Sequence, residues 1–339
     1  MRRIIWAGPM GVKRRFWGIA ACLLLGPATT SAVNRSEAVE AALRAYTEGE
    51  YPKAVQILQA ASAADPQNSE IYLLLSKSYY EMQDFERASA SAEKAVAIDP
   101  RNSFNHEWLG RASGERADRA GWFAAISLAK KARKEFAAAV ELDERNFSAM
   151  QALIEFDCSA PGMVGGGEDK AAREIERIAA LDAAEGHYAR GNCRRQKKDY
   201  AAADAEFTAA LESSPTSVDL VYDIGDHAMK HDQSDRLIVV AQLGEKLNPR
   251  DPRGSFYRAV AAILRGEALP EAENAIRGYI SNAPRRNTYP SPAMGHFWLG
   301  RLRERQNDLQ QATNEYEAAL KLEPKNRYAN EALKRVKKH

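Results

Sequence analysis

Apolar and small residues recur at a helical spacing between Ser69 and Asn102, a stretch of 34 residues. Residues three or four apart lie on one face of a helix, so the stretch presents two stripes joined by a polar turn. Pro100 follows the second stripe and ends its helix, because proline has no N–H to donate. The pattern therefore predicts two closely packed helices, with contact residues Tyr72, Leu75, Ser76 and Tyr79, then Ala88, Ala92 and Ala95.

Bulky residues at positions 4, 7 and 11, small residues at positions 8, 20 and 27 and proline at position 32 resemble the tetratricopeptide repeat (TPR) family. The resemblance implies an all-α, right-handed superhelical solenoid of helix–turn–helix repeats. Such arrays need a polar capping helix to cover the last apolar face. The resemblance also implies a scaffold that binds peptides or other proteins. It implies neither an enzymatic activity nor a cofactor.

Eight repeats are expected over nearly the whole chain. Longer spacings in the third and fourth repeats predict insertions near 114–123 and 159–167. The turn-rich segment 287–292 is expected to be a flexible linker, and residues 327–339 a capping helix. The expected repeats cover 35–68, 69–102, 103–146, 147–185, 184–217, 218–251, 252–286 and 293–326.

The first 32 residues have the layout of a secretory signal peptide. Basic residues precede a short apolar run from Phe16 to Gly26, and Thr30 to Ala32 supply small residues before a cleavage point. The sequence therefore predicts an exported protein, with the periplasm as its expected location. Two alternatives are a lipoprotein attached through Cys22 and a twin-arginine signal at Arg14 and Arg15. Most of the apolar run follows Cys22, which argues against the lipoprotein.

The charge balance gives no reason to expect a nucleic-acid partner. The chain holds 48 basic and 46 acidic residues, and the first 32 residues contain five basic residues and no acidic ones. The remaining chain therefore has a formal charge of −3. The apolar run in the leader is also too short for a stable span, so no membrane anchor is expected in the mature chain.

Partner-binding residues are expected on the concave wall, which in the TPR family is lined by the first helix of each repeat. Positions 5 and 9 supply aromatic, basic and amide groups suited to an extended peptide or a partner helix. The predicted partner-binding residues are Lys77, Arg111, Tyr188, Asn192, Tyr222, Phe256, Phe297 and Arg301. Trp122 and Phe123, in the third-repeat insertion, form a second candidate surface that could instead fold back over the array. The alternative for the first set is that several aromatics simply pack on the next repeat.

The sequence contains few motifs that indicate catalysis or the binding of a metal ion or an anion. The chain has no phosphate-binding loop of the Walker type, no nucleophile elbow and no zinc-type cysteine pair, so no enzyme activity and no cofactor are predicted. An alternative function is a metal- or anion-dependent binding protein or enzyme. His227 and His231 lie four residues apart and could share a helical face, and Gly165–Gly167 precedes a helix that could hold an anion. The simpler interpretation of the two features is a solvated face and a shaped turn.

Cys158 and Cys193 are the cysteines that remain after the leader. They fall in the first helices of neighbouring repeats, which pack side by side in this family. An oxidising compartment would permit a disulfide if the Cα atoms approach within about 7 Å. The alternative is two free, half-buried thiols. The overall expectation is a protein–protein interaction scaffold of the bacterial cell envelope.

Overall fold

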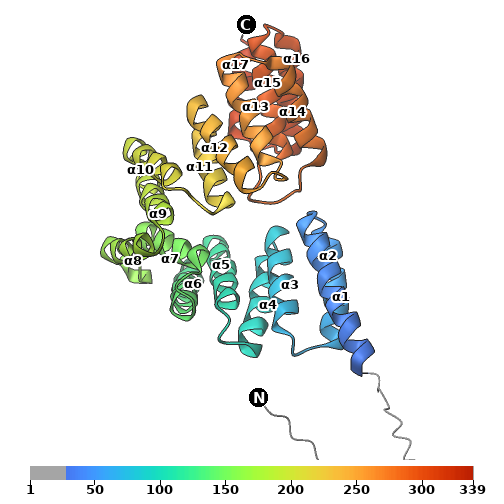
Figure 1. Ribbon diagram of the computed structural model, residues 1–339, viewed down its shortest axis with the longest axis vertical. Coiled ribbons are helices and arrows are strands. Elements are labelled where there is room, and N and C mark those ends of the chain that lie inside the picture. The colour runs from blue at the N-terminus through green and yellow to red at the C-terminus, as the bar shows by residue number, and fades with distance from the viewer. Residues whose placement is uncertain (1–27, 339) are drawn as a thin grey trace, which may run out of the picture.

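The computed structural model describes residues 28–338, and these residues form an all-α array (Figure 1). They contain seventeen α-helices, one short 3₁₀ turn and no strand, which confirms the predicted fold class. The first ten helices are α1 (Ala28–Thr47), α2 (Tyr51–Ala64), α3 (Ser69–Glu81), α4 (Phe85–Ile98), α5 (Ser103–Arg119), α6 (Trp122–Leu142), α7 (Phe147–Ser159), α8 (Glu168–Leu181), α9 (Ala183–Gln196) and α10 (Tyr200–Glu212).

The remaining helices continue the same alternation, so that eight consecutive pairs are followed by a single last helix. They are α11 (Val218–Lys230), α12 (Ser234–Leu247), α13 (Arg253–Arg265), α14 (Leu269–Asn282), α15 (Pro292–Arg305), α16 (Leu309–Leu322) and α17 (Arg327–Val336). Helix α17 buries Ala329, Ala332 and Val336 against the array, as a capping helix does. No helix in residues 28–338 is long and apolar enough to cross a membrane.

Asparagine caps start four of the helices. Asn68, Asn102, Asn146 and Asn326 each accept a hydrogen bond from a backbone N–H in the first turn of the following helix. For Asn102 the bond comes from the N–H of Phe104 at 3.0 Å. These bonds satisfy donors that a helix end leaves free. The Asp-Pro-x-Asn sequences between repeats therefore end one helix and begin the next.

A glycine facing an aromatic ring sets the close approach of the two helices in three repeats. The pairs are Gly110 with Phe136, Gly191 with Phe207, and Gly300 with Tyr316. A Cβ atom added to these glycines would lie 2.7, 2.5 and 2.4 Å from the ring, which is too close for any side chain. The small residue at position 8 is thus required by the ring at position 24.

The first helices of the repeats form the inner wall of the array. Helix α3 packs on α5, α5 on α7, α7 on α9, and α13 on α15. The array curves through these contacts, so that the N-terminal and C-terminal parts approach each other (Figure 1). Helices α10 and α11 are the exception among the described helices, because they are the only consecutive pair whose backbones do not pack closely.

Side chains bridge this open junction between α10 and α11. Asp204 of α10 accepts hydrogen bonds from His227, Gln233 and Arg236. Tyr188 of α9 donates to Asp223 of α11 at 2.7 Å. Buried apolar side chains of the two helices, such as Phe207 and Val221, also belong to one core cluster. The two halves of the array are therefore joined here by polar and apolar side chains, without close backbone packing.

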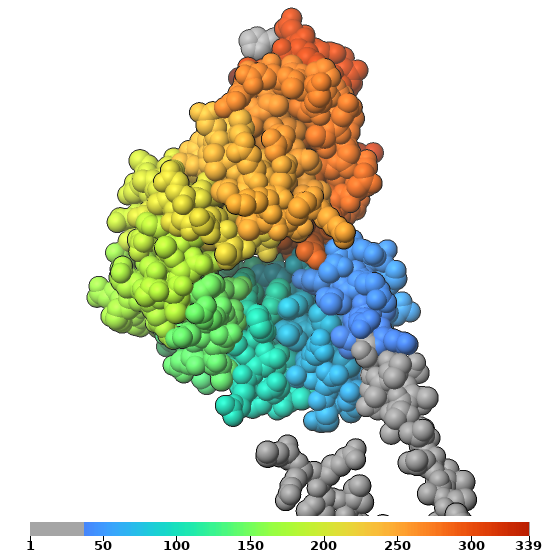
Figure 2. Space-filling view, in the orientation of Figure 1, coloured from blue at the N-terminus to red at the C-terminus, as the bar shows by residue number. Residues whose placement is uncertain are grey.

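The segment between α14 and α15 contacts the first repeats, which closes the array into a ring (Figure 2). The backbone N–H of Asn287 donates to the Glu81 carboxylate at 3.0 Å. The guanidinium of Arg286 lies 5.7 Å from the ring centre of Tyr46. Gly49 faces the backbone of Arg285, where an added Cβ would lie 3.0 Å from the nitrogen. We call these contacts the ring closure.

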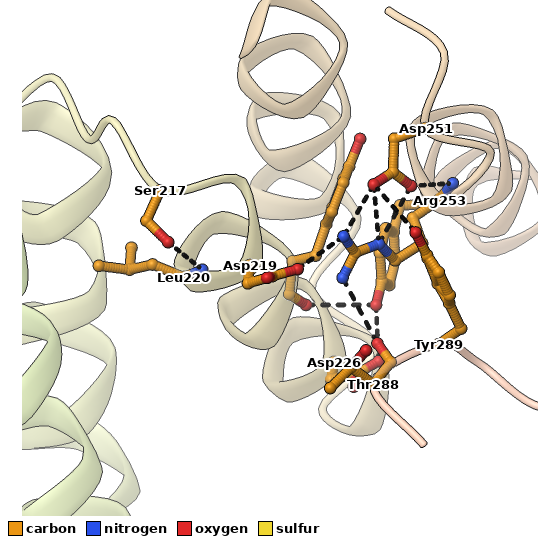
Figure 3. Close-up of polar contacts among 10 residues, drawn as sticks. Ser217, Asp219, Leu220, Asp226, Asp251, Arg253, Thr288 and Tyr289 are labelled. Atoms are coloured by element: carbon orange, nitrogen blue, oxygen red, sulfur yellow. Dashed lines mark hydrogen bonds and ion pairs between the residues drawn. The ribbon is translucent and has the colours of Figure 1, made fainter. Parts of the chain in front are cut away.

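The same segment is also fixed to its own half of the array, around Arg253 (Figure 3). This buried guanidinium lies between the rings of Tyr222 and Tyr289, at 4.4 and 4.2 Å, and pairs with Asp251 and Asp219 at 2.7 Å. It also donates to the carbonyl of Thr288 at 3.4 Å. The turn-rich sequence at 287–292 predicted a flexible linker. The structure instead holds this segment from both sides, and α15 already begins at Pro292.

Candidate interaction surface

The aromatic residues predicted to line the concave wall of the C-terminal half are buried. Tyr222, Phe256 and Phe297 are 1, 0 and 6% exposed. Tyr222 stacks on Tyr257 with ring centres 5.5 Å apart, and Phe256 lies 4.5 Å from Tyr279. The structure therefore corrects the prediction for these three side chains. They fill the space between repeats and leave little surface for a partner.

Three further predicted residues are engaged within the array. Tyr188 is half-buried and its hydroxyl is bonded to Asp223, while Asn192 is buried. Arg301 pairs with Asp232 at 2.9 Å and lies over the ring of Trp298. These contacts join repeats to one another, so a partner would have to compete with them.

The accessible part of the predicted surface lies on α3 and α5, in the N-terminal half. Trp108, which is half-buried, is flanked by the Lys77 ammonium at 5.3 Å and the Arg111 guanidinium at 5.8 Å from its ring centre. Tyr80 packs edge-on against the same ring at 5.4 Å. We call Lys77, Tyr80, Trp108 and Arg111 the inner-wall platform. It combines an aromatic face with two cations, a pairing that favours peptide recognition.

A buried carboxylate fixes the cationic end of the platform. Glu107 is 2% exposed and accepts hydrogen bonds from Arg111 at 2.9 Å, Ser148 at 2.7 Å and Asn146 at 3.2 Å. Arg111 also donates to the Ser148 hydroxyl at 2.9 Å. The guanidinium is thus held in one orientation, and the platform needs little rearrangement before a partner binds.

The two cations differ in their electrostatic environment. Burial alone would lower the pKa of Arg111, but the Glu107 carboxylate holds that pKa above its ordinary value. Burial lowers the pKa of Lys77, and Glu107 only partly offsets this effect. Lys77 is therefore a poorly solvated ammonium without an ion pair among the described residues. A carboxylate or carbonyl of a partner would supply the hydrogen bonds that it lacks.

Trp108 was not among the residues predicted from the sequence. The predicted residues stand at positions 5 and 9 of their repeats or in the third-repeat insertion, whereas Trp108 stands at position 6 of the third repeat. A tryptophan next to Glu107 at position 5 was a signal that could have identified it. The equivalent residue of the eighth repeat, Trp298, is only 1% exposed, so position alone does not determine accessibility.

The second predicted surface is accessible. Trp122 is 67% exposed and Phe123 is 88% exposed, at the start of α6. The insertion lengthens α5 and α6, whose connecting turn is at Ala120 and Gly121. The aromatic pair therefore stands at the end of a projecting helical hairpin and does not fold back over the array.

The histidine pair of the alternative prediction is built into the junction between α10 and α11. The rings of His227 and His231 are 4.5 Å apart, and His227 is buried with its Nε2 atom 3.0 Å from Asp204. Burial lowers the pKa of His227, the charge of His231 adds to this shift, and Asp204 opposes it. Residues 28–338 hold no group of three or more His, Cys, Asp or Glu side chains placed to bind a metal ion.

The glycine turn of the alternative prediction closes the connection between α7 and α8. The N–H of Gly167 donates to the carbonyl of Asp157 at 2.9 Å, and Gly166 lies against the backbone of Ala160. Gly165 has a positive φ of 102°, which glycine adopts without strain. Glu168 and Asp169 occupy the first turn of α8, where a bound anion would meet like charges.

Cys158 and Cys193 are joined by a disulfide, with Cα atoms 5.6 Å apart. The bridge links α7 to α9 across neighbouring repeats.

The architecture is that of an α-solenoid, a class of helical repeat proteins. Family models described as tetratricopeptide repeat match residues 45–104, 184–217 and 293–326. These matches show tetratricopeptide repeats in three segments of the chain, and the helix pairs described above continue the same architecture between them. Proteins of this family are generally scaffolds that bind other proteins, and they are typically not catalytic. No curated protein matches the chain over its sequence.

Solved structures share the fold at low sequence identity. IFIT1, as a monomeric mutant with Gppp-AAAA, is 18% identical, covers 88% of this chain and 70% of its own, and has a TM-score of 0.51. A thermophilic TPR protein of Thermus thermophilus is 19% identical, with coverage of 55% and 94% and a TM-score of 0.46. A TPR protein of Parabacteroides merdae is 13% identical, with coverage of 89% and 98% and a TM-score of 0.40.

Proposed function

We propose that this protein is a protein–protein interaction scaffold of the bacterial cell envelope, and that an extended segment of its partner binds along the inner-wall platform. The signal-like leader supports export to the periplasm, although residues 1–27 lie outside the described residues. The observation that carries the binding proposal is Trp108, an accessible indole between two cations on the inner wall. The equivalent wall of the C-terminal half has its aromatics buried.

The chemistry of the platform suits a partner segment with an apolar or aromatic side chain next to a carboxylate or a free carbonyl. The side chain would cover Trp108, and the oxygen would bind Lys77. The rigid Arg111 would orient the segment, because Glu107 and Ser148 already fix its guanidinium. No step of this proposal requires a cofactor or a reaction.

The proposal can be tested by site-specific photo-cross-linking in the envelope. A photoreactive phenylalanine analogue replaces Phe104, an exposed residue one helical turn before Trp108 on α5, or Ala90, an exposed position on α4. A partner bound to the inner wall should be captured from position 104 and not from position 90. Its capture should fall at least tenfold in Lys77→Glu and in Trp108→Ala.

Lys134→Glu provides the matched control, since Lys134 is an exposed lysine on α6. Capture should be unchanged in this variant. Circular dichroism and a thermal melt establish that each variant is folded. Equal capture from positions 104 and 90, or full capture in both platform variants, would rule out binding on the inner wall.

A further inference from the structure

The two insertions predicted from the sequence meet in space and build a cleft at the edge of the inner wall. Helix α6 contacts the short 3₁₀ turn Gly162–Val164 that follows α7. Arg133 of α6 donates to both carboxylate oxygens of the buried Asp157, at 2.7 and 2.9 Å. This paired contact holds α6 against the end of α7, from which the second insertion follows, so the walls of the cleft are fixed before a ligand binds.

The cleft has a volume of about 530 Å³ and is lined mainly by apolar side chains. Ile126 and Phe156 are half-buried in its walls, whereas Met163 and Trp122 are 55 and 67% exposed at its mouth. This volume lies within the usual range for ligand sites, and large apolar side chains left in solvent commonly mark a binding surface. A bulky apolar group would remove this surface from water.

The rim of the cleft is acidic. Asp118 and Glu155 line it, are exposed, and form no ion pair among the described residues. Glu115 accepts a hydrogen bond from Tyr80 at 3.2 Å and lies 3.6 Å from Arg119. The basic residue of the lining, Arg111, is already neutralised by Glu107. The charge that a ligand would meet at the mouth is therefore negative.

From this geometry we infer that the cleft binds a partner segment in which a bulky apolar side chain is flanked by lysine or arginine. The apolar side chain enters between α6 and the 3₁₀ turn, and the basic groups pair with Asp118 and Glu155. An anionic membrane surface or a nucleic acid would be repelled by the same two carboxylates. The inference rests on the proposed scaffold function, but it concerns a neighbouring surface, which shares Tyr80 and Arg111 with the inner-wall platform and includes neither Lys77 nor Trp108.

Three short peptides test the inference on the purified full chain. Each is amidated, carries a neutral dansyl label, and has Lys-Trp-Lys, Glu-Trp-Glu or Lys-Ala-Lys between Gly-Ser and Ser-Gly ends. Fluorescence anisotropy should show saturable binding of the Lys-Trp-Lys peptide, at least fivefold tighter than binding of the other two. Equal binding of the Glu-Trp-Glu peptide would overturn the inference, because the acidic rim would then have no role.

Variants locate the binding to the cleft. Asp118→Asn combined with Glu155→Gln should weaken binding of the Lys-Trp-Lys peptide roughly threefold to tenfold, since exposed charge pairs contribute modestly. Ala125→Phe should abolish binding by filling the cleft. Met163→Lys, at an exposed position, should weaken binding by charge repulsion even if Ala125→Phe does not fold. Glu141→Gln with Glu144→Gln, at exposed positions at and just beyond the end of α6, is the control and should bind normally.

A lipid surface or a second copy of this chain in the cleft would each give a different experimental result. Stronger binding to anionic vesicles than to neutral vesicles, lost in Ala125→Phe, would assign the cleft to a lipid surface. Self-association in sedimentation experiments, lost in the same variant, would assign it to a second copy of this chain. Either result would overturn the inference. The platform variants Lys77→Glu and Trp108→Ala should change the affinity for the Lys-Trp-Lys peptide by less than twofold. A result that disproves binding in the cleft can therefore be told apart from one that disproves binding on the inner-wall platform.

Discussion

The backbone N–H of Asn287 donates to the carboxylate of Glu81 at 3.0 Å, across a separation of 206 residues in the sequence. This bond belongs to the ring closure, in which Arg285 and Arg286 also contact the first repeat. The chain from α3 to the α14–α15 segment thereby forms a closed circuit. Its weakest backbone packing lies at the junction of α10 and α11.

We expect Glu81→Ala to open the ring. The exposed hydrogen bond to this carboxylate contributes about 1 kcal/mol to the closed state. Its loss would shift the ratio of closed to open molecules roughly fivefold. Opening of the ring would lengthen and broaden the distribution of distances between spin labels on cysteines introduced at Lys53 and Asn282. Glu144→Ala should leave the distribution unchanged. An unchanged distribution in Glu81→Ala would mean that the other contacts suffice for closure.

Arg253 should be essential for the stability of the C-terminal half. Replacing it with alanine leaves Asp251 buried without its partner, and breaking such a pair typically lowers the free energy of unfolding by about 3–5 kcal/mol. Lysine should not restore stability, because it lacks the planar fork that bonds Asp251 and Asp219 and stacks between Tyr222 and Tyr289. Chemical denaturation of the two variants provides the measurement. Arg250→Ala, at an exposed neighbouring site, serves as the reference and should change little.

The disulfide should stabilise the contact between repeats four and five. Replacing Cys158 and Cys193 with serine should lower the free energy of unfolding by about 2–4 kcal/mol, given the 35-residue separation. Urea denaturation with and without a reducing agent gives the comparison. The reducing agent should destabilise the wild type and leave the double variant unaffected. Identical unfolding of the reduced and oxidised wild type would show that the bridge adds no stability.

Stability should fall on mild acidification because of His227. Burial lowers the pKa of this residue in the folded state, so between that pKa and about 6.5 the unfolded chain binds a proton that the folded chain does not. The free energy of unfolding therefore decreases as the pH falls through this window, by at most about 1.4 kcal/mol per pH unit. Thermal melts from pH 7.5 to 5 should show a smaller loss in His227→Gln. An equal loss in both proteins would assign the pH dependence to other groups.

The fold was predictable because the residues that determine helix packing recur at fixed positions within each repeat. A small residue such as Gly191 must face a ring such as Phe207, and an asparagine such as Asn102 must start the next helix. These are local relationships with fixed spacing. The resemblance to the TPR family at these positions was therefore enough to define the helix pairs.

The accessible surface was less predictable because it depends on how tightly successive repeats curve. Phe256 and Phe297 occupy the expected position, yet inter-repeat packing buries them. Trp108 occupies a neighbouring position and is only half-buried, with Lys77 and Arg111 beside its ring. The contact of Asn287 with Glu81 also could not be predicted from the repeat pattern, because no spacing rule relates residues 206 positions apart.

The ring closure also bears on how cooperatively the protein unfolds. In an open solenoid the terminal repeat has one neighbour, so it can fray by breaking a single interface. Here the first repeat, which contains Tyr46 and Gly49, is held by its neighbour and by Arg285 and Arg286 as well. Fraying from this end must break both interfaces together. The closed array should therefore lose its first repeat later than an open array of the same length, which extends protection from hydrogen exchange to the N-terminal helices.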